Sequence, residues 1–234
     1  MFTIKLADRI FSIDNKYGYI EKLCRDYIIP DQDADIISVS DKEIQSENTG
    51  EGVFSDGYLE SLAIYRKICD GLRDQDILLF HCSAILVDEK AYLFTAPSGT
   101  GKSTHVRLWK SLFGDRVKII NDDKPLLRFE KDRVFVYGTP YAGKHNLQNN
   151  ISAEAAGIIV LHQAKENKIK KMTEQEAFPM LINQSYRGTT PDSIVKTINL
   201  VKRLSKIDVY SLGCNISNEA VELVYNTLKG NDGK

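Results

Sequence analysis

The sequence predicts a mixed α/β fold, α+β-like in arrangement, with a largely antiparallel β core and flanking helices. Two observations predict the antiparallel core. The apolar residues 77–87 and 91–95 are separated only by a short polar turn, and residues 126–129 and 134–137 flank a second turn of the same kind. Such short connections join antiparallel strands, because a parallel pair needs a long crossover. As a third observation, apolar residues recur at helical spacing over 57–73, which predicts a helix packed on a core.

Length and composition are those of an ordinary globular protein with room for a sizeable core. The 234 residues carry 31 Lys and Arg against 32 Asp and Glu, so the formal net charge is −1. This balance gives no reason to expect binding to nucleic acid or to an anionic membrane surface. No apolar run reaches the roughly 18 residues of a membrane helix, and the first residues lack the pattern of a signal peptide. We therefore expect a cytoplasmic protein that binds neither nucleic acid nor membrane.

Residues 1–74 form a small N-terminal β/α region that we expect to pack on the core. Alternating apolar and polar residues over 2–13 predict two edge strands. A short helix is predicted within 17–29, and a strand at 36–39. The polar stretch 41–56, rich in Asp, Glu, Ser, Asn and Gly, predicts a flexible connection to the helix that follows.

The larger predicted domain, residues 75–230, adds further elements to the two hairpins. Its strand 91–95 leads through small residues into a helix that starts at Lys102 and ends at Gly114. Residues 117–121 predict a strand that ends in two adjacent carboxylates. The remaining predicted elements are a strand at 157–162, helices at 177–186 and 193–204, a strand at 209–212, a helix at 219–228 and a disordered tail at 230–234.

The segment Ala96-Pro97-Ser98-Gly99-Thr100-Gly101-Lys102-Ser103 has the spacing of a phosphate-binding loop, or P-loop. It departs from the pattern G-x-x-x-x-G-K-[ST] only at Ala96, which stands where the first Gly is expected. Its glycines let successive backbone N–H groups point at phosphate oxygens, Lys102 would reach the β and γ phosphates, and Ser103 would bind Mg²⁺. The alternative is an ordinary surface turn. The predicted nucleotide-binding residues are Ser98, Gly99, Thr100, Gly101, Lys102, Ser103 and Thr104.

Asp122 and Asp123 follow a predicted strand about twenty residues after Lys102, where P-loop proteins usually carry an Asp that anchors the metal. Two adjacent residues on an extended backbone point to opposite sides, so one carboxylate can face Mg²⁺ while the other faces the substrate. Phosphoryl transfer needs both a second metal anchor and a base for the acceptor hydroxyl. The sequence therefore predicts a phosphotransferase site, with an acidic surface turn as the alternative.

His81, the P-loop segment and Asn121-Asp122-Asp123 together resemble the catalytic domain of HPr kinase/phosphorylase and, more distantly, ATP-dependent phosphoenolpyruvate carboxykinase. The resemblance covers residues 77–165, and His81 precedes Lys102 by 21 residues, as a histidine does in HPr kinases. It implies the fold of the HPr kinase C-terminal domain and a kinase that uses ATP and Mg²⁺. Because HPr kinases are hexamers, self-association is expected as well.

The same resemblance implies a role for each residue. Lys102 becomes the phosphate clamp, Ser103 and Asp123 the metal ligands, Asp122 the general base, and His81 a neighbour of that base and of the transferred phosphoryl group. The segments with which HPr kinases dock HPr and switch to dephosphorylation, and their separate N-terminal domain, have no counterpart in this sequence. The hydroxyl acceptor therefore stays open between a serine of a protein or peptide and a small molecule, and so does a phosphorylase activity.

Two other functions remain open: a carboxykinase acting on an oxaloacetate-type acid, and a nucleotide-binding sensor or assembly protein without turnover. Asp122 distinguishes the sensor, which has no use for a carboxylate facing an acceptor. Three weaker site candidates are Lys144 and His145, which could contact the transferred phosphoryl group, and Arg187, which could stabilise transition-state charge. A plain connecting loop and a surface arginine are the alternatives for these residues.

Overall fold

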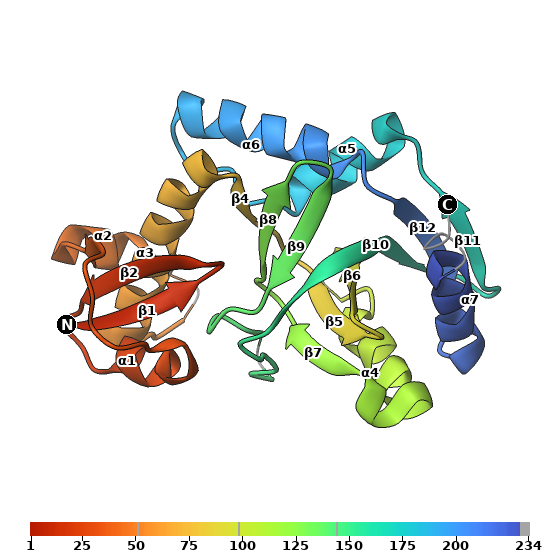
Figure 1. Cartoon of the computed structure of the whole chain (residues 1–234), viewed down its shortest axis with the longest axis horizontal. Helices are drawn as coiled ribbons and strands as arrows, with labels where there is room; N and C mark the ends of the chain where they lie inside the picture. The colour runs from red at the N-terminus through yellow and green to blue at the C-terminus, as the bar shows by residue number, and fades with distance from the viewer. Residues whose placement is uncertain (51, 98, 144, 230–234) are drawn as a thin grey trace. The chain divides into compact units, whose positions relative to one another are not determined.

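The computed structural model describes residues 1–50, 52–97, 99–143 and 145–229 (Figure 1). The chain forms two compact units, Met1–Ile77 and Leu78–Lys234. Helices and strands alternate irregularly in both, which confirms the mixed α/β fold. The predicted disordered tail at 230–234 lies outside the described residues. None of the helices in the described part of the chain is both long enough and apolar enough to cross a bilayer.

The first unit is a small sheet accompanied by helices. β1 and β2 form an antiparallel hairpin, and β3 pairs with β2 in parallel. Because the strand order is β1-β2-β3, the prediction of two edge strands is correct for β1 and wrong for β2. The elements are β1 (Phe2–Leu6), β2 (Arg9–Asp14), α1 (Tyr19–Leu23), a 3₁₀ turn (Arg25–Tyr27), β3 (Asp35–Ser38), α2 (Asp41–Ser46), α3 (Asp56–Leu72) and a 3₁₀ turn (Arg73–Gln75).

Helix α2 shows that the predicted flexible connection at 41–56 is wrong over its first part. Ser40 and Glu43 form a capping box, in which the Ser40 hydroxyl accepts the N–H of Glu43 and the Glu43 carboxylate accepts the N–H of Ser40 at 2.7 Å. The apolar side chain of Ile44 is buried beneath the helix. The Ser-x-x-Glu pattern predicts such a cap, but it lies in a polar stretch whose composition resembles a loop.

The second unit is built on a mixed sheet with strand order β4-β8-β9-β10-β6-β5-β7, extended from β10 through β12 to β11. Most neighbours are antiparallel, as predicted; β6 and β12 pair with β10 in parallel. The elements are β4 (Ile77–Leu79), β5 (Ser83–Val87), β6 (Lys90–Thr95), α4 (Lys102–Phe113), a 3₁₀ turn (Gly114–Arg116), β7 (Lys118–Asn121), β8 (Leu126–Glu130), β9 (Arg133–Tyr137), β10 (Ser152–Gln163), β11 (Lys168–Lys171), α5 (Glu174–Asn183), α6 (Pro191–Leu204), β12 (Val209–Cys214) and α7 (Asn218–Lys229).

Two predicted strands differ from the observed ones. The apolar run 77–87 is two strands, β4 and β5, separated at residues 80–82. Backbone hydrogen bonds explain the break, because the N–H of Phe80 donates to Pro125 and that of His81 to Gln184 rather than to a neighbouring strand of the ladder. β10 is longer than the predicted strand 157–162. The sequence does not predict β11, because three of its four residues are lysines and it lacks the apolar pattern of a strand.

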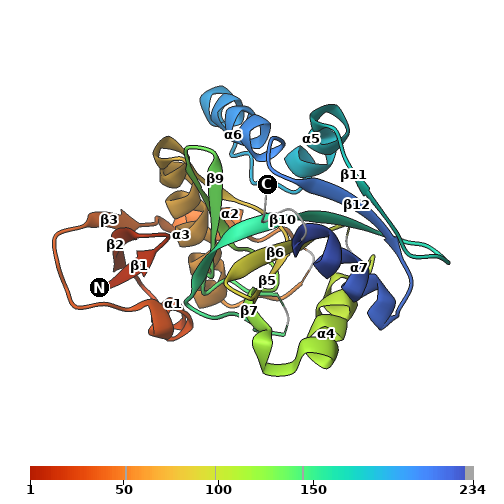
Figure 2. The same ribbon diagram turned by 45° about the vertical axis from the view of Figure 1, so that its right-hand side comes forward.

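The sheet of the second unit is covered on both faces. Alternate residues along each strand point to opposite faces, so that Leu93 of β6 packs with α5 and α6 whereas Phe94 packs with α4 and α7. Figure 2 shows α5 and α6 on one side of β10 and α7 on the other. Trp109 of α4 is fully buried in the second of these cores. This packing fixes the position of α4, whose first turn borders the site described next.

Candidate functional site

Three connecting segments of the second unit meet at one edge of its sheet. β6 and β7 lie on either side of β5 and both run antiparallel to it, so their C-terminal ends reach the edge where β5 begins. The segment before β5 carries His81, the loop after β6 carries the glycines, and the bend after β7 carries Asp122 and Asp123. The topology therefore brings together side chains that are as many as 42 positions apart in the sequence.

The glycine loop, residues 96–101, joins β6 to α4. Gly99 and Gly101 have φ of 81° and 117°, a conformation that residues with a side chain rarely adopt. Gly101 is the N-cap of α4, and no side-chain hydrogen bond caps this end in the described residues. The first backbone N–H groups of the helix are therefore available to an anion. The Nζ of Lys102 donates to the carbonyl oxygen of Ala96 at 3.0 Å, across the base of the loop.

The carboxylate bend, residues 121–124, is shaped by the buried side chain of Asn121. Its Oδ1 accepts the backbone N–H groups of Asp123 at 2.8 Å and Lys124 at 2.7 Å. Its Nδ2 donates to the carbonyl oxygens of Thr139 at 3.0 Å and Tyr141 at 3.2 Å. Asn121 thus ties the bend to the loop after β9 and turns the chain sharply after β7. The two carboxylates that follow are held on this bend rather than on the extended strand that the sequence predicts.

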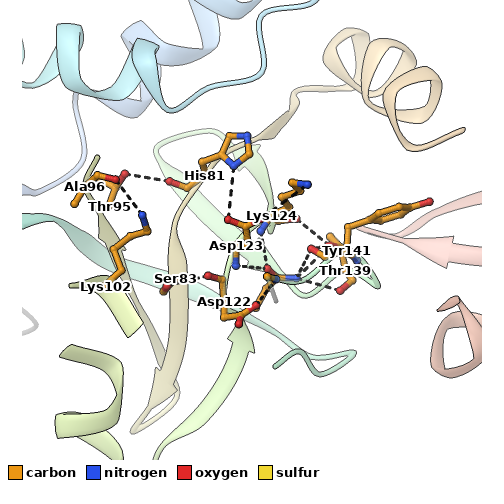
Figure 3. Close-up of polar contacts among 12 residues, drawn as sticks. His81, Ser83, Thr95, Ala96, Lys102, Asp122, Asp123, Lys124, Thr139 and Tyr141 are labelled. Atoms are coloured by element: carbon orange, nitrogen blue, oxygen red, sulfur yellow. Dashed lines mark hydrogen bonds and ion pairs between the residues drawn. The ribbon is translucent and has the colours of Figure 1, made fainter. Parts of the chain in front are cut away.

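The two carboxylates of the bend point to opposite sides, as Figure 3 shows. Asp122 turns toward the loop after β9, where its Oδ1 accepts the N–H of Gly143 at 2.6 Å. Asp123 turns toward His81, whose Nδ1 lies 3.9 Å from Oδ1 of Asp123. The Nζ of Lys124 is also 3.9 Å from this carboxylate. The sequence predicts that the two carboxylates point to opposite sides, and they do. A bend, rather than the pleat of a strand, produces this orientation.

The surroundings shift the pKa values of the two carboxyls in opposite directions. Burial raises the pKa of Asp122 above its ordinary value, the hydrogen bond from Gly143 offsets only part of this, and the charge of Asp123 adds to the rise. Burial also acts to raise the pKa of Asp123, but the His81 ring and the charges of Lys124 and Lys102 outweigh it, so this pKa is lowered. Adjacent carboxyls whose pKa values are driven apart are suited to different roles.

His81 is positioned by its backbone. Its N–H donates to the carbonyl oxygen of Gln184 at 2.7 Å, and its own carbonyl oxygen accepts the hydroxyl of Thr95 at 3.0 Å. Its side chain remains 42% exposed. His81 is therefore not a core histidine satisfied by buried partners, and its ring is accessible beside Asp123.

Three cavities adjoin one another at this edge. The central cavity has a volume of about 530 Å³, the Leu161 cavity about 420 Å³ and the Arg107 cavity about 760 Å³. The central cavity shares lining residues with each of the other two, which share none with one another among the described residues. The shared residues are Gly99, Gly101 and Thr104 toward the Leu161 cavity, and Ser103, Asp122 and His145 toward the Arg107 cavity. The central cavity therefore lies between the other two.

Most of the predicted site residues border these cavities. The central cavity is lined by Gly99, Gly101, Lys102, Ser103, Thr104, Asp122, Asp123, Gly143 and His145. Thr100 lines the Leu161 cavity. Ser98 and Lys144, both candidates from the sequence, lie outside the described residues. Arg187 is exposed and does not border any of the three cavities as the described residues define them.

The central cavity offers oxygen ligands suited to Mg²⁺. Ser103 and Asp123 both line it, beside the uncapped start of α4. Among the described residues, no group of three or more His, Cys, Asp and Glu side chains could hold a metal ion by itself. Mg²⁺ commonly binds through one or two protein oxygens together with substrate phosphates and water. The residues present therefore fit Mg²⁺ that arrives with a nucleotide.

The sequence does not predict the positioning role of three residues: the buried Asn121, which belongs to the motif of the resemblance, the buried Thr139, and Gly143. The hydroxyl of Thr139 donates to the carbonyl oxygen of Lys124 at 2.8 Å, which fixes the far end of the bend. A Cβ added to Gly143 would lie 3.3 Å from both carboxylate oxygens of Asp122. The Asn before the two Asp residues is the only sequence signal for this arrangement, since the partners follow it by 18 to 22 positions.

Comparison with known proteins finds a weak structural similarity. No family model matches the sequence, and no curated protein sequence is detectably similar to it. Among solved structures, the chain is similar to the Hpr(Ser) kinase/phosphatase from Coxiella burnetii, with a TM-score of 0.39 and 14% identity. The match covers 66% of this chain and 99% of that chain. A likeness of this strength transfers no activity, so the function must be inferred from the site itself.

Proposed function

We propose that the protein is a phosphotransferase of the HPr-kinase-like type that moves the γ-phosphoryl group of ATP to a hydroxyl acceptor with the help of Mg²⁺. The observation that carries this proposal is the order of the three cavities. The glycine loop and the two carboxylates line the central cavity, and the outer cavities open from it on different sets of residues. In-line phosphoryl transfer needs donor and acceptor on opposite sides of the transferred group. A row of three cavities offers that arrangement.

The donor nucleotide would occupy the Leu161 and central cavities. Apolar side chains and the amides of Gln163 and Asn215 line the Leu161 cavity, which suits a nucleoside. The phosphates would then lie against the glycine loop and the start of α4, where free N–H groups and Lys102 offer positive partners. Ser103 and Asp123 would hold Mg²⁺, which when bound offsets phosphate charge.

The acceptor hydroxyl would approach from the Arg107 cavity and meet Asp122 at its junction with the central cavity. One carboxylate oxygen of Asp122 accepts the N–H of Gly143 and keeps the group oriented. The other oxygen would take the hydroxyl proton as the acceptor oxygen bonds to the γ-phosphorus. The bond from that phosphorus to the β,γ-bridging oxygen breaks, and its electron pair leaves with ADP. His81 would keep Asp123 oriented toward the metal.

The experiment is a coupled assay of ADP release from ATP and Mg²⁺, run with a panel of alcohols, serine-bearing peptides and hydroxy acids. Nucleotide affinity is measured separately by fluorescence titration with an ATP analogue. Lys102→Ala should lower turnover about 10²- to 10³-fold, as expected for loss of one preorganised charge on the transferred group. Lys206→Ala is the matched control, because Lys206 is exposed on the same unit.

Two results would contradict the proposal. Acceptor-dependent ADP release that survives in the Lys102 variant would mean that the glycine loop does not hold the phosphates. Nucleotide binding with no ADP release, unchanged by Asp122→Asn, would favour the nucleotide sensor instead. A sensor has no use for the Arg107 cavity beyond Asp122, which is why turnover is the stronger proposal.

A further inference from the structure

The Arg107 cavity is the largest of the three, and Asp122, but not Asp123, is among its described lining residues. Its lining comes from one face of α4, the start of β5, residues 117–119, the carboxylate bend and the loop before β10. Ser103, Asp122 and His145 are its border with the central cavity. At about 760 Å³ it lies within the usual range for small-molecule sites. It is therefore large enough to hold an acceptor whose hydroxyl reaches Asp122.

The charge in this cavity is unbalanced. Arg107, Lys110 and Lys118 line it, and Asp122 is the only carboxylate among its described lining residues. The Arg107 guanidinium contacts neutral oxygens alone in the described residues, those of Ser103 at 3.3 Å and Thr104 at 3.4 Å. A cleft lined mainly by one sign of charge attracts ligands of the other sign. These cations therefore favour an anion in the cavity.

Acidic neighbours neutralise Lys110 and Lys118 only weakly, so most of their positive charge is available to a ligand. The Nζ of Lys110 donates to the carbonyl oxygen of Val117 at 3.3 Å, and its acidic neighbour Asp115 is fully exposed at 3.5 Å. Such an exposed ion pair competes weakly for the ammonium group. Lys118 forms no ion pair with an acid within the part of the chain that the structure describes.

Besides these charged residues, the cavity lining includes an aliphatic wall. Its aliphatic lining residues are Val106, Val117, Ile119 and Leu147. An aliphatic wall of this kind suits the carbon frame of a small ligand.

We infer that the acceptor is a small hydroxyl compound that also carries a carboxylate or a phosphate. This inference rests on the proposed function and names its substrate class. The anionic group binds Arg107, Lys110 and Lys118, the carbon frame lies on the aliphatic wall, and the hydroxyl faces Asp122. Transfer then proceeds as described above, with the hydroxyl proton passing to Asp122 and the phosphoryl group to the acceptor oxygen.

The test uses pairs of compounds that share a hydroxyl and differ in charge: N-acetylserine against N-acetylserinamide, and glycerol 3-phosphate against glycerol. Ligand-observed NMR measures the binding of each compound to the full chain, which requires no turnover. At least one anionic member should bind about tenfold more tightly than its neutral partner, as expected for one charge-assisted hydrogen bond. This preference should fall as salt is added.

Variants then locate the site. Arg107→Gln, Lys110→Gln and Lys118→Gln should each weaken binding of the anionic compound severalfold and leave the affinity for ATP unchanged. Lys202→Gln, an exposed change on α6, is the matched control. Unchanged ATP affinity also shows that each variant is folded.

The outcomes separate this inference from the proposed function. Neutral compounds that bind as well as anionic ones, or a preference that survives all three variants, would overturn the inference. Lys102-dependent transfer to neutral alcohols or to internal serines of peptides would overturn it while leaving the kinase intact. Anion binding that depends on the three cations, without any ADP release, would support the inferred site and refute the phosphotransferase.

Discussion

The glycine loop and the carboxylate bend face the same cavity but are held in different ways. In the loop, space is open around Gly99 and Gly101, and the side chains of Thr100 and Lys102 donate to the nearby carbonyl oxygens of Pro97 and Ala96. In the bend, Asn121 is completely buried and hydrogen-bonded on both sides. The loop takes its shape from backbone conformation, whereas tertiary contacts from another loop shape the bend.

This difference suits the two proposed tasks. A loop with open N–H groups can wrap around phosphates of a nucleotide that enters and leaves. A base must instead be held close to its productive position, because a misplacement of about 1 Å can cost roughly 10²-fold in rate. We therefore expect substitutions in the bend to affect turnover more than substitutions in the loop glycines, which should act on nucleotide affinity.

The largest expected effect is that of Asp122→Asn, which should lower turnover about 10²- to 10⁴-fold through loss of the base. The amide oxygen of Asn can still accept the N–H of Gly143, so the bend keeps its shape and ATP affinity should stay the same. Steady-state kinetics and nucleotide titration measure the two quantities. Asp123→Asn is the paired control, expected to weaken binding of ATP in Mg²⁺. If Asp122→Asn weakens affinity and spares turnover, the two roles are reversed.

The second-largest effect is expected from Asn121→Ala, which removes the partners of backbone groups in the bend and in the loop after β9. Each buried group that loses its hydrogen bond costs about 1 to 3 kcal/mol, so the free energy of unfolding should fall by about 2 to 4 kcal/mol. Turnover should fall roughly 10- to 100-fold as Asp122 loses its fixed position. Denaturant unfolding and kinetics provide the measurements.

Asn149→Ala is the matched control for this change. The amide of Asn149 donates to the carbonyl oxygen of Ile119 at 2.7 Å in an exposed setting. Water can replace that bond, so its loss should cost about 1 kcal/mol or less. Equal destabilisation by the two substitutions would show that the bend is not specially supported.

The same distinction between local conformation and tertiary contacts decides which parts of the structure the sequence predicts. Local patterns predict the hairpin of β5 and β6, helix α4 and its end at Gly114, all of which the structure confirms. The spacing of glycines and Lys102 likewise predicts the conformation of the loop, since positive φ is a local property of the chain. The break between β4 and β5 is not predictable in this way, because its hydrogen-bond partners, Pro125 and Gln184, are remote in sequence.

The candidate site shows the same limit. The order β6-β5-β7 brings the loop and the bend to one edge, yet nothing local predicts which strands become neighbours. Thr139 and Gly143 contact the bend from the loop after β9, in which the sequence predicts Lys144 and His145 as site candidates but gives no sign of these contacts. Arg107 of α4 and Lys118 of β7 line the same cavity, which no local pattern in the sequence predicts. The conformation of the glycine loop could therefore be predicted from the sequence, whereas the positioning residues and the Arg107 cavity required the tertiary structure.

A smaller effect, on ATP affinity rather than on turnover, is expected in the glycine loop from Gly101→Ala. The added Cβ meets no atom within 4 Å, so the cost comes only from φ of 117° and amounts to about 1 to 3 kcal/mol. If the strain is relieved by a change in loop shape, affinity for ATP should fall about tenfold while turnover at saturation changes little. Gly71→Ala, in α3 and also without steric contact, is the control and should not weaken ATP binding. Loss of turnover at saturating ATP would mean that the loop positions the reacting groups as the bend does.

The smallest effect is expected from Gly143→Ala, which tests the bend without removing any of its hydrogen bonds. The new Cβ would lie 3.3 Å from both oxygens of Asp122, so the carboxylate must shift by a fraction of an ångström. A shift of this kind costs about 0.5 to 1 kcal/mol, which corresponds to roughly two- to fivefold in turnover. ATP affinity should not change, and the free energy of unfolding should fall by no more than about the same 0.5 to 1 kcal/mol. In a double-mutant cycle the effect should disappear in the Asp122→Asn background, because the position of the base then no longer limits transfer. An undiminished effect in that background would mean that Gly143 acts through the loop after β9 and not through Asp122.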